Sequence, residues 1–207
     1  MEKINAFGRI ISANSQECVV GYRTSEDEIP QFASMVRIPV QGQSSFQIYG
    51  LVTDIQIEED GFLRQLAVAD SISDEVILDN RINRNIPIVL RILYVGYQNE
   101  AGISHLLPPR PPLTLDSIFL CNFSEVAAFT FYGNFGYFRH ILRAVNIPAA
   151  ELLAVHFRQA AVAQMAKNHP IWIKNAVQEI IRLMQDDYAG LTSILGALGD
   201  ADITLSL

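Results

Sequence analysis

The hydrophobic pattern of this chain changes near residue 122, and that change limits the folds open to it. Before residue 122, apolar residues come in short runs rich in β-branched side chains, separated by polar or glycine-containing turns. After it, they recur every three or four residues, as on one face of an α-helix. The sequence therefore predicts an α+β chain with two domains, residues 1–122 built from strands and residues 123–207 built from helices.

The clearest strand of the first part is the run IPIVLRILYVGY at 86–97. Similar runs occupy 7–11, 18–22, 35–40 and 46–57. Connections of a few residues cannot cross over between parallel strands, so these strands are expected to be antiparallel. Short strands separated by polar turns favour a small β-barrel or a sandwich, and we expect the barrel.

Three features interrupt the strand pattern. Gly50 lies inside the longest run and predicts a bulge or a barrel corner. Residues 62–85 do not decide between strand and helix. The proline-rich run Pro108–Pro112 is stiff and extended, which predicts a rigid exit from the first part to the second. A ligand for a domain that binds polyproline helices is the alternative.

The second part is expected to form a helical bundle. Residues 149–166 contain seven alanines, which allow close helix approach. Residues 171–188 carry apolar side chains at spacings of three and four, and Gly190 fits a C-terminal cap after them. Shorter helices are expected at 124–131, 138–145 and 191–198.

Charge and hydropathy narrow the function classes. Fifteen basic and 22 acidic residues give a net charge of -7, so a strongly basic nucleic-acid binder is not expected. Residues 1–122 hold nine basic and fifteen acidic residues, and residues 123–207 hold six and seven. The mean hydropathy of +0.20 is high and indicates a large core or an apolar surface covered by a partner.

Motifs of catalysis are missing from the sequence. No Gly-Lys pair occurs, so a P-loop is excluded, and no GxGxxG or GxSxG is present. No histidine pair has metal-ligand spacing. We therefore expect no enzyme activity, cofactor or metal. Two histidines in one deep pocket would favour an enzyme without a short motif; the four candidates are His105, His140, His156 and His169.

The two cysteines, Cys18 and Cys121, lie far apart and are expected to be free buried thiols in a reducing compartment. The N-terminal residues do not form a signal peptide, and no apolar run reaches the ~18 residues that span a bilayer. A cytoplasmic chain without membrane contact is expected.

Six aromatic residues fall within ten positions near the start of the helical part. They suit either a core or a protein interface. Base stacking is the weaker alternative, because the segment supplies little positive charge. The candidate interface residues are Phe129, Phe131, Tyr132, Phe135, Tyr137 and Phe138.

The first part resembles a known family. Gly8 and Arg9 lie in the opening strand, Gly50 precedes a valine-containing strand, and Pro108 and Pro109 follow the strong strand at 88–95. This arrangement is similar to the HAS barrel, found at the N-terminus of HerA-type DNA translocases and of the ATP synthase α and β subunits. In that family the barrel crowns a hexameric P-loop motor, helps to hold subunits together and, in HerA-type proteins, offers a docking surface to a nuclease.

This chain has no motor after the barrel. The resemblance therefore implies a non-enzymatic assembly or docking module that forms a homo-oligomer or binds a protein partner such as a motor or nuclease. A DNA-associated accessory factor is the alternative that follows from analogy with the translocases. It requires a basic stripe, for which the candidates are Arg81, Arg84, Arg91 and Arg110.

Overall fold

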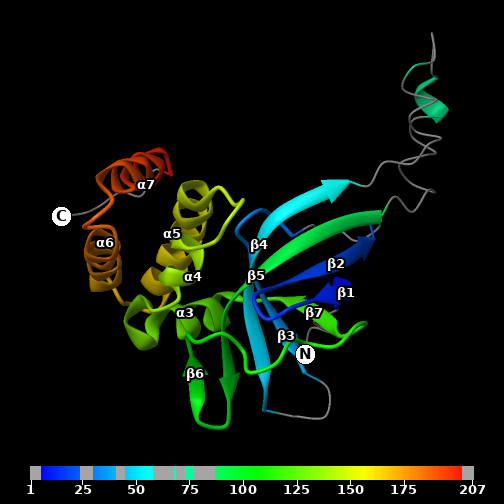
Figure 1. Ribbon diagram of the computed structural model, residues 1–207, viewed down its shortest axis with the longest axis horizontal. Helices are drawn as coiled ribbons and strands as arrows, with labels where there is room; N and C mark the ends of the chain where they lie inside the picture. The colour runs from blue at the N-terminus through cyan, green and yellow to red at the C-terminus, as the bar shows by residue number, and fades with distance from the viewer. Residues whose placement is uncertain are drawn as a thin grey trace.

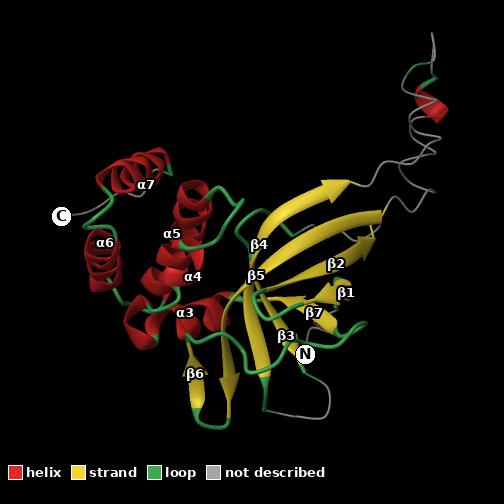
Figure 2. Cartoon of the chain, in the orientation of Figure 1, coloured by secondary structure: helices red, strands yellow, loops and turns green. Residues whose placement is uncertain are grey.

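The chain folds as an α+β protein with a closed, six-stranded antiparallel β-barrel, against one side of which the helices pack (Figures 1 and 2). Residues 62–85, whose sequence does not decide between strand and helix, lie outside the described residues except for 68 and 73–76. This computed structural model describes residues 6–23, 30–40, 45–57, 68, 73–76 and 87–201.

The barrel closes because every strand has a partner on each side. Its order is β1-β2-β5-β4-β3-β7 and back to β1, and each pair is antiparallel. The closed ladder excludes the sandwich alternative, and β6 extends from the end of β5 as a hairpin. The strands are β1 (Gly8–Ala13), β2 (Glu17–Arg23), β3 (Met35–Pro39), β4 (Gln47–Ile57), β5 (Pro87–Asn99), β6 (Gly102–Ser104) and β7 (Ser117–Leu120).

Strands β4 and β5 are buried on both faces where the helices cover them. In β4, Ile48 and Val52 face the barrel interior, whereas Tyr49 and Leu51 face the helices. Strands covered on both sides have nearly continuous hydrophobic sequences, and this explains the strong run at 86–97. In β5 the inward residues are Leu90, Ile92 and Tyr94, and the outward residues are Leu93 and Val95.

The predicted bulge at Gly50 is confirmed. The register of β4 against β5 shifts between Tyr49 and Gly50. A β carbon at position 50 would collide with Cγ2 of Ile92 and would lie 3.0 Å from the carbonyl oxygen of Leu93. Glycine is required here because two strands approach too closely for any side chain between them.

The prediction that Pro108–Pro112 forms an exit from the barrel is wrong. This segment connects β6 to β7, and β7 is itself a barrel strand that pairs with β1 and β3. Arg9 fastens the end of the connection, since its Nη1 donates to the carbonyl oxygen of Leu115 (3.1 Å) and to Oγ of Ser117 (2.7 Å). The proline-rich segment is therefore a stiff connection within the barrel.

The other residues of the family resemblance are accounted for by packing. A β carbon at Gly8 would lie 2.7 Å from Cγ1 of Val20, so this glycine lets β1 lie close against β2. Pro108 is buried and Pro109 is exposed in the connection to β7. These contacts show how the residues pack in this barrel, and membership of the HAS family stays a prediction.

The helices follow the barrel and begin with a capping box. Asn122 Oδ1 accepts a hydrogen bond from the backbone N–H of Glu125 (3.0 Å), and the Glu125 carboxylate accepts one from the backbone N–H of Asn122 (2.9 Å). The helices are α3 (Phe123–Phe131), the 3-10 helix η1 (Gly133–Phe135), α4 (Phe138–Leu142), α5 (Ala149–Ala166), α6 (Ile171–Leu183) and α7 (Tyr188–Asp200).

One hydrophobic core joins the helices to the barrel. Leu51 and Val95 from the barrel belong to the same buried cluster as Phe129 of α3 and Phe157 of α5. A second cluster fills the barrel interior. The division into domains at residue 122 stays a prediction, because it falls between segments that share a core.

Two predictions about the last helices are wrong. Helix α6 ends at Leu183, five residues before the predicted end at Tyr188. Gly190 does not cap it, because Gly190 lies in the first turn of α7. There the carboxylate of Asp187 accepts a hydrogen bond from the backbone N–H of Gly190 (2.9 Å). The aspartate therefore starts a new helix at the place where the glycine suggested an end.

Two glycines on the outer face of helix α7, Gly196 and Gly199, allow a test of whether this face is uncovered in solution. A β carbon at Gly196 or Gly199 would meet nothing within 4 Å. Since glycine destabilises a helix interior by about 0.5–1 kcal/mol relative to alanine, Gly196→Ala and Gly199→Ala are each expected to raise the melting temperature. Gly190→Ala is the control and is expected to lower it, because the new β carbon would collide with the Asp187 carboxylate. A lower melting temperature for Gly196→Ala would mean that this face is covered in solution.

Candidate functional site

A cavity of about 280 Å³ lies between the barrel and α4. One wall comes from the start of β2 and the middle of β5, and the other comes from α4 and the residues just after it. Its polar lining residues are Gln16, Arg139, His140 and Arg143. Its apolar lining residues are Leu93, Tyr94, Leu107 and Ala144.

Two of the polar side chains share one anchor. The carbonyl oxygen of His105 accepts a hydrogen bond from Nη2 of Arg139 and another from Nε2 of His140 (2.8 Å). Because Nε2 of His140 donates to a carbonyl, that nitrogen carries the proton in the neutral ring. His105 follows β6, so the barrel holds these two side chains of α4 in place.

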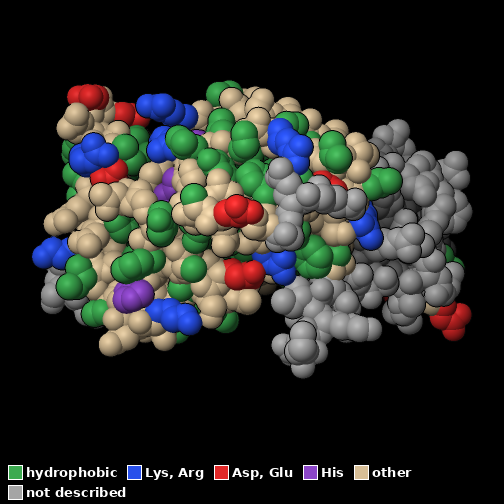
Figure 3. All heavy atoms as spheres, turned by 90° about the horizontal axis from the view of Figure 1, so that it is seen from below, with side chains coloured by type: hydrophobic (Ala, Val, Ile, Leu, Met, Phe, Trp, Pro, Cys, Tyr) green, Lys and Arg blue, Asp and Glu red, His purple; other side chains and the backbone are tan. Residues whose placement is uncertain are grey.

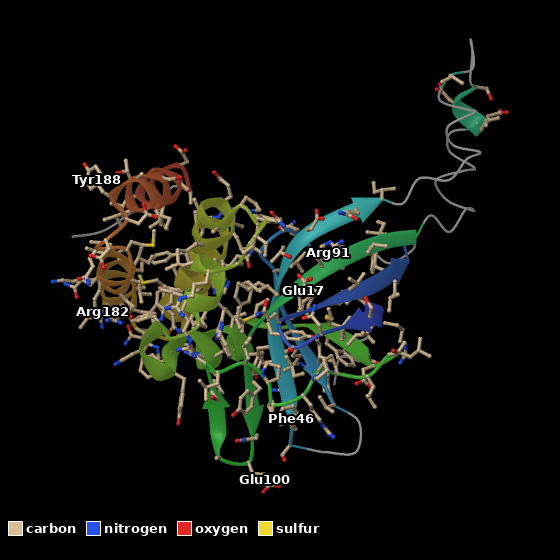
Figure 4. The ribbon with its side chains drawn as sticks, in the orientation of Figure 1. Glu17, Phe46, Arg91, Glu100, Arg182 and Tyr188 are labelled. Atoms are coloured by element: carbon tan, nitrogen blue, oxygen red, sulfur yellow. The ribbon has the colours of Figure 1, made fainter. Side chains whose placement is uncertain are left out.

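The cavity is electropositive. Neither Arg139 nor Arg143 forms an ion pair with a carboxylate of the described residues, and the lining contains no acidic side chain. Glu17, the first residue of β2 and the neighbour of the lining residue Gln16, is labelled in Figure 4 at the middle of the molecule, where the strands meet the helices. Burial lowers the pKa of His140, and the nearby Arg139 and Arg143 lower it further.

A closed cluster of histidines and aromatic rings adjoins the cavity wall. The His105 ring lies 4.7 Å from that of Phe129 and 5.0 Å from that of Tyr137. His156 continues the cluster, with Nε2 3.1 Å from the hydroxyl oxygen of Tyr137. Burial lowers the pKa of His105 and of His156 from 6.5 to about 4, so both rings are neutral at pH 7.

The rings of this cluster are packed against one another inside the protein. Within the part of the chain that the structure describes, Nδ1 of His105 and Nδ1 of His156 are buried and form no hydrogen bond. His169 lies apart, where its ring stacks on Phe131 with the centroids 4.4 Å apart. Of the four histidines, His140 is the one that lines the cavity, and the question of enzyme activity stays open.

The six candidate interface residues divide between core and surface. Phe129, Tyr137 and Phe138 are fully buried, so these three belong to the core. Phe135 is partly buried and packs on Phe138 and Trp172. Phe131 and Tyr132 remain exposed at the end of α3, and for these two the interface role stays a prediction.

The basic stripe needed by a DNA-associated factor is not assembled by the residues that can be placed. Arg91 lies 3.9 Å from the carboxylate of Asp54, so part of its charge is neutralised. Arg110 is exposed in the connection between β6 and β7. Arg81 and Arg84 lie outside the described residues. The stripe therefore stays a prediction.

Cys18 and Cys121 are free thiols, as the sequence predicts, and burial raises the pKa of Cys18 to about 12. The described residues contain no group of three histidine, cysteine or acidic side chains placed to hold a metal ion. None of the described helices has the length and apolar character needed to cross a bilayer.

No protein-family model matches this chain, and no curated protein matches it.

Proposed function

We propose that this chain is a non-enzymatic assembly module that associates with a second copy of itself through its helical part. The observation that carries the proposal is an apolar patch where the ends of three helices meet. Phe131, Tyr132, Met165 and Ile171 form this end patch, and they are 60%, 51%, 55% and 67% exposed. Monomers bury most large apolar groups, so clustered exposure of this kind is typical of an interface.

Hydrogen bonds between neighbouring residues bring the members of the end patch together. Nε1 of Trp172, next to Ile171, donates to the carbonyl oxygen of Thr130, next to Phe131 (3.0 Å). Nε2 of Gln164, next to Met165, donates to Oγ1 of Thr130 (2.7 Å). Three helices therefore converge at Thr130, which places the exposed neighbours of these buried residues at the same end of the helical part. Figure 3 shows hydrophobic side chains between scattered charged groups on the underside of the helical part.

Charge favours a second copy as the occupant of the end patch. Residues 123–207 carry a net charge of -1, so two helical parts repel each other little. Residues 1–122 carry -6, so contact between two barrels would be opposed by like charges. A symmetric dimer through the helical parts is therefore the arrangement with the smallest electrostatic cost.

The resemblance to the HAS barrel supports an assembly role in general, since those barrels help to hold subunits together, whereas the charge of this chain favours its helical part as the contact. It also suggests the alternative occupant, a protein partner such as a motor or nuclease. A pull-down that recovers such a protein only with an intact end patch would favour that alternative.

The proposal is tested by multi-angle light scattering. Wild-type protein is expected to exceed the 23.1 kDa mass of one chain and to approach twice that mass as its concentration rises. Ile171→Glu places a charge in the end patch at the first residue of α6, where the helix dipole tolerates an acid. We expect it to weaken association by at least about tenfold.

Leu113→Glu is the matched control, because Leu113 is also exposed, at 66%, but lies in the connection between β6 and β7. It is expected to leave the mass unchanged. A single-chain mass at every concentration, or equal loss in both variants, would contradict self-association through the end patch.

A further inference from the structure

We propose that the cavity between the barrel and α4 binds a small organic anion whose phosphate or carboxylate group lies against Arg139 and Arg143. This inference goes beyond the proposed function and does not depend on it. Two arginines without a carboxylate partner among the described residues, set beside an apolar wall, carry it.

One of the two arginines of the cavity is held in place, and neither has a carboxylate partner among the described residues. Arg139 is held by the His105 carbonyl, so it cannot turn away to find another partner. Arg143, one helical turn later, lines the same cavity without a carboxylate partner among the described residues. Guanidinium groups bind phosphate and carboxylate through paired hydrogen bonds, so two of them on one wall favour an oxyanion.

The opposite side of the cavity limits the ligand further. Leu93 and Leu107 offer no hydrogen bond from their side chains, whereas Gln16 offers an amide at the edge. A bare inorganic ion would leave these apolar side chains without contact. A cavity of about 280 Å³ is at the small end of known ligand sites, so the ligand combines one oxyanion with a compact apolar group.

The imidazole of His140 can report the binding of an anion, because it lies inside the site. Its ring lines the cavity and its charge is opposed by Arg139 and Arg143. A bound anion would offset both arginines, so the pKa of His140 is expected to rise when the cavity fills. His156 and His169 do not line the cavity and serve as internal references.

The test uses phenyl phosphate as the probe and follows the imidazole signals of the full chain by NMR. Phenyl phosphate is expected to shift the His140 signal in a saturable way and to raise its pKa. Inorganic phosphate is expected to bind at least about tenfold more weakly, because it lacks the apolar group. Phenol, which lacks the charge, is expected to leave His140 unchanged.

Arg143→Ala is the decisive variant, because Arg143 is exposed and its side chain forms no hydrogen bond with another described residue, so the fold should persist. It is expected to weaken phenyl phosphate binding by at least about tenfold. Arg158→Ala, on the exposed face of α5, is the control and is expected to leave binding unchanged. Absence of a His140 shift at millimolar probe, equal binding of inorganic phosphate, or equal loss in both variants would overturn the proposal.

Discussion

Lowering the pH from 7 to 4 is expected to reduce the free energy of unfolding by about 3 kcal/mol for each of the two enclosed histidines, His105 and His156. Together these losses are comparable to the whole stability of a typical domain, about 5–15 kcal/mol. The chain should therefore be much less stable in mild acid than at pH 7. Urea titrations at several pH values, followed by the fluorescence of the buried Trp172, would measure the effect.

The sign of the pH effect on stability follows from the pH range in which the unfolded and the folded chain each bind protons. In the unfolded chain a histidine has a pKa near 6.5, whereas burial lowers the pKa of these two to about 4 in the folded chain. As the pH falls below 6.5, the unfolded chain binds protons first and is favoured. Stability should be constant above about pH 7.5, fall between pH 6.5 and 4, and level off below pH 4.

His156→Gln separates this effect from general acid denaturation. The glutamine amide can still form a hydrogen bond with the hydroxyl of Tyr137, but it does not titrate. About half of the acid-induced loss in the free energy of unfolding should therefore disappear. His169→Gln is the control, since it leaves both enclosed histidines in place. Equal pH profiles for wild type and His156→Gln would show that His156 is not enclosed as described.

Gly96→Ala is expected to cost about 3 kcal/mol or more. A β carbon at position 96 of β5 would collide with the carbonyl oxygen of Ser104 in β6. It would also lie 2.9 Å from Cε2 of Phe129 in α3. Neither group can move, because the first belongs to the backbone and the second is fully buried against Tyr49, with ring centroids 4.8 Å apart. Urea unfolding at pH 7 would measure the loss.

Gly21→Ala is the matched control in another barrel strand. The nearest atom to its new β carbon is Cδ1 of Ile11 at 3.2 Å, and Ile11 is exposed and free to shift. Its effect is expected to stay within about 0.5 kcal/mol. If the two variants were equally stable, α3 would not be seated on β5 as the structure describes.

The sequence predicted the elements whose signals are local. Helix α5 occupies the predicted range, because alanine-rich periodicity needs no distant partner. The Gly50 bulge was predicted correctly because a glycine inside a long strand often marks a bulge or a close approach of two backbones. The end of α6 was missed because the cap at Asp187 lies three residues before a glycine that suggested a stop. The proline run was misread because its stiffness does not reveal that a barrel strand follows.

The cavity was not predicted, because its walls come from residues far apart in the chain. The pairing of β2 with β5 places Gln16 and Leu93 at the cavity, and no pattern in the local sequence predicts this contact. A weak signal existed in Arg139 and Arg143, two basic residues four apart and so on one helix face in an acidic chain. Burial of Phe129 and Tyr137 depended on the same long-range packing, so core and interface could not be told apart beforehand.

Because β4 and β5 are buried on both faces, the barrel depends on the helices that cover it. Leu51 and Val95 on the outer wall of the barrel are covered by the helices, so deleting the helices would leave a hydrophobic wall in water. We expect homologous proteins to gain or lose the outward-facing residues of these two strands together with α3 and α5, as one inherited unit.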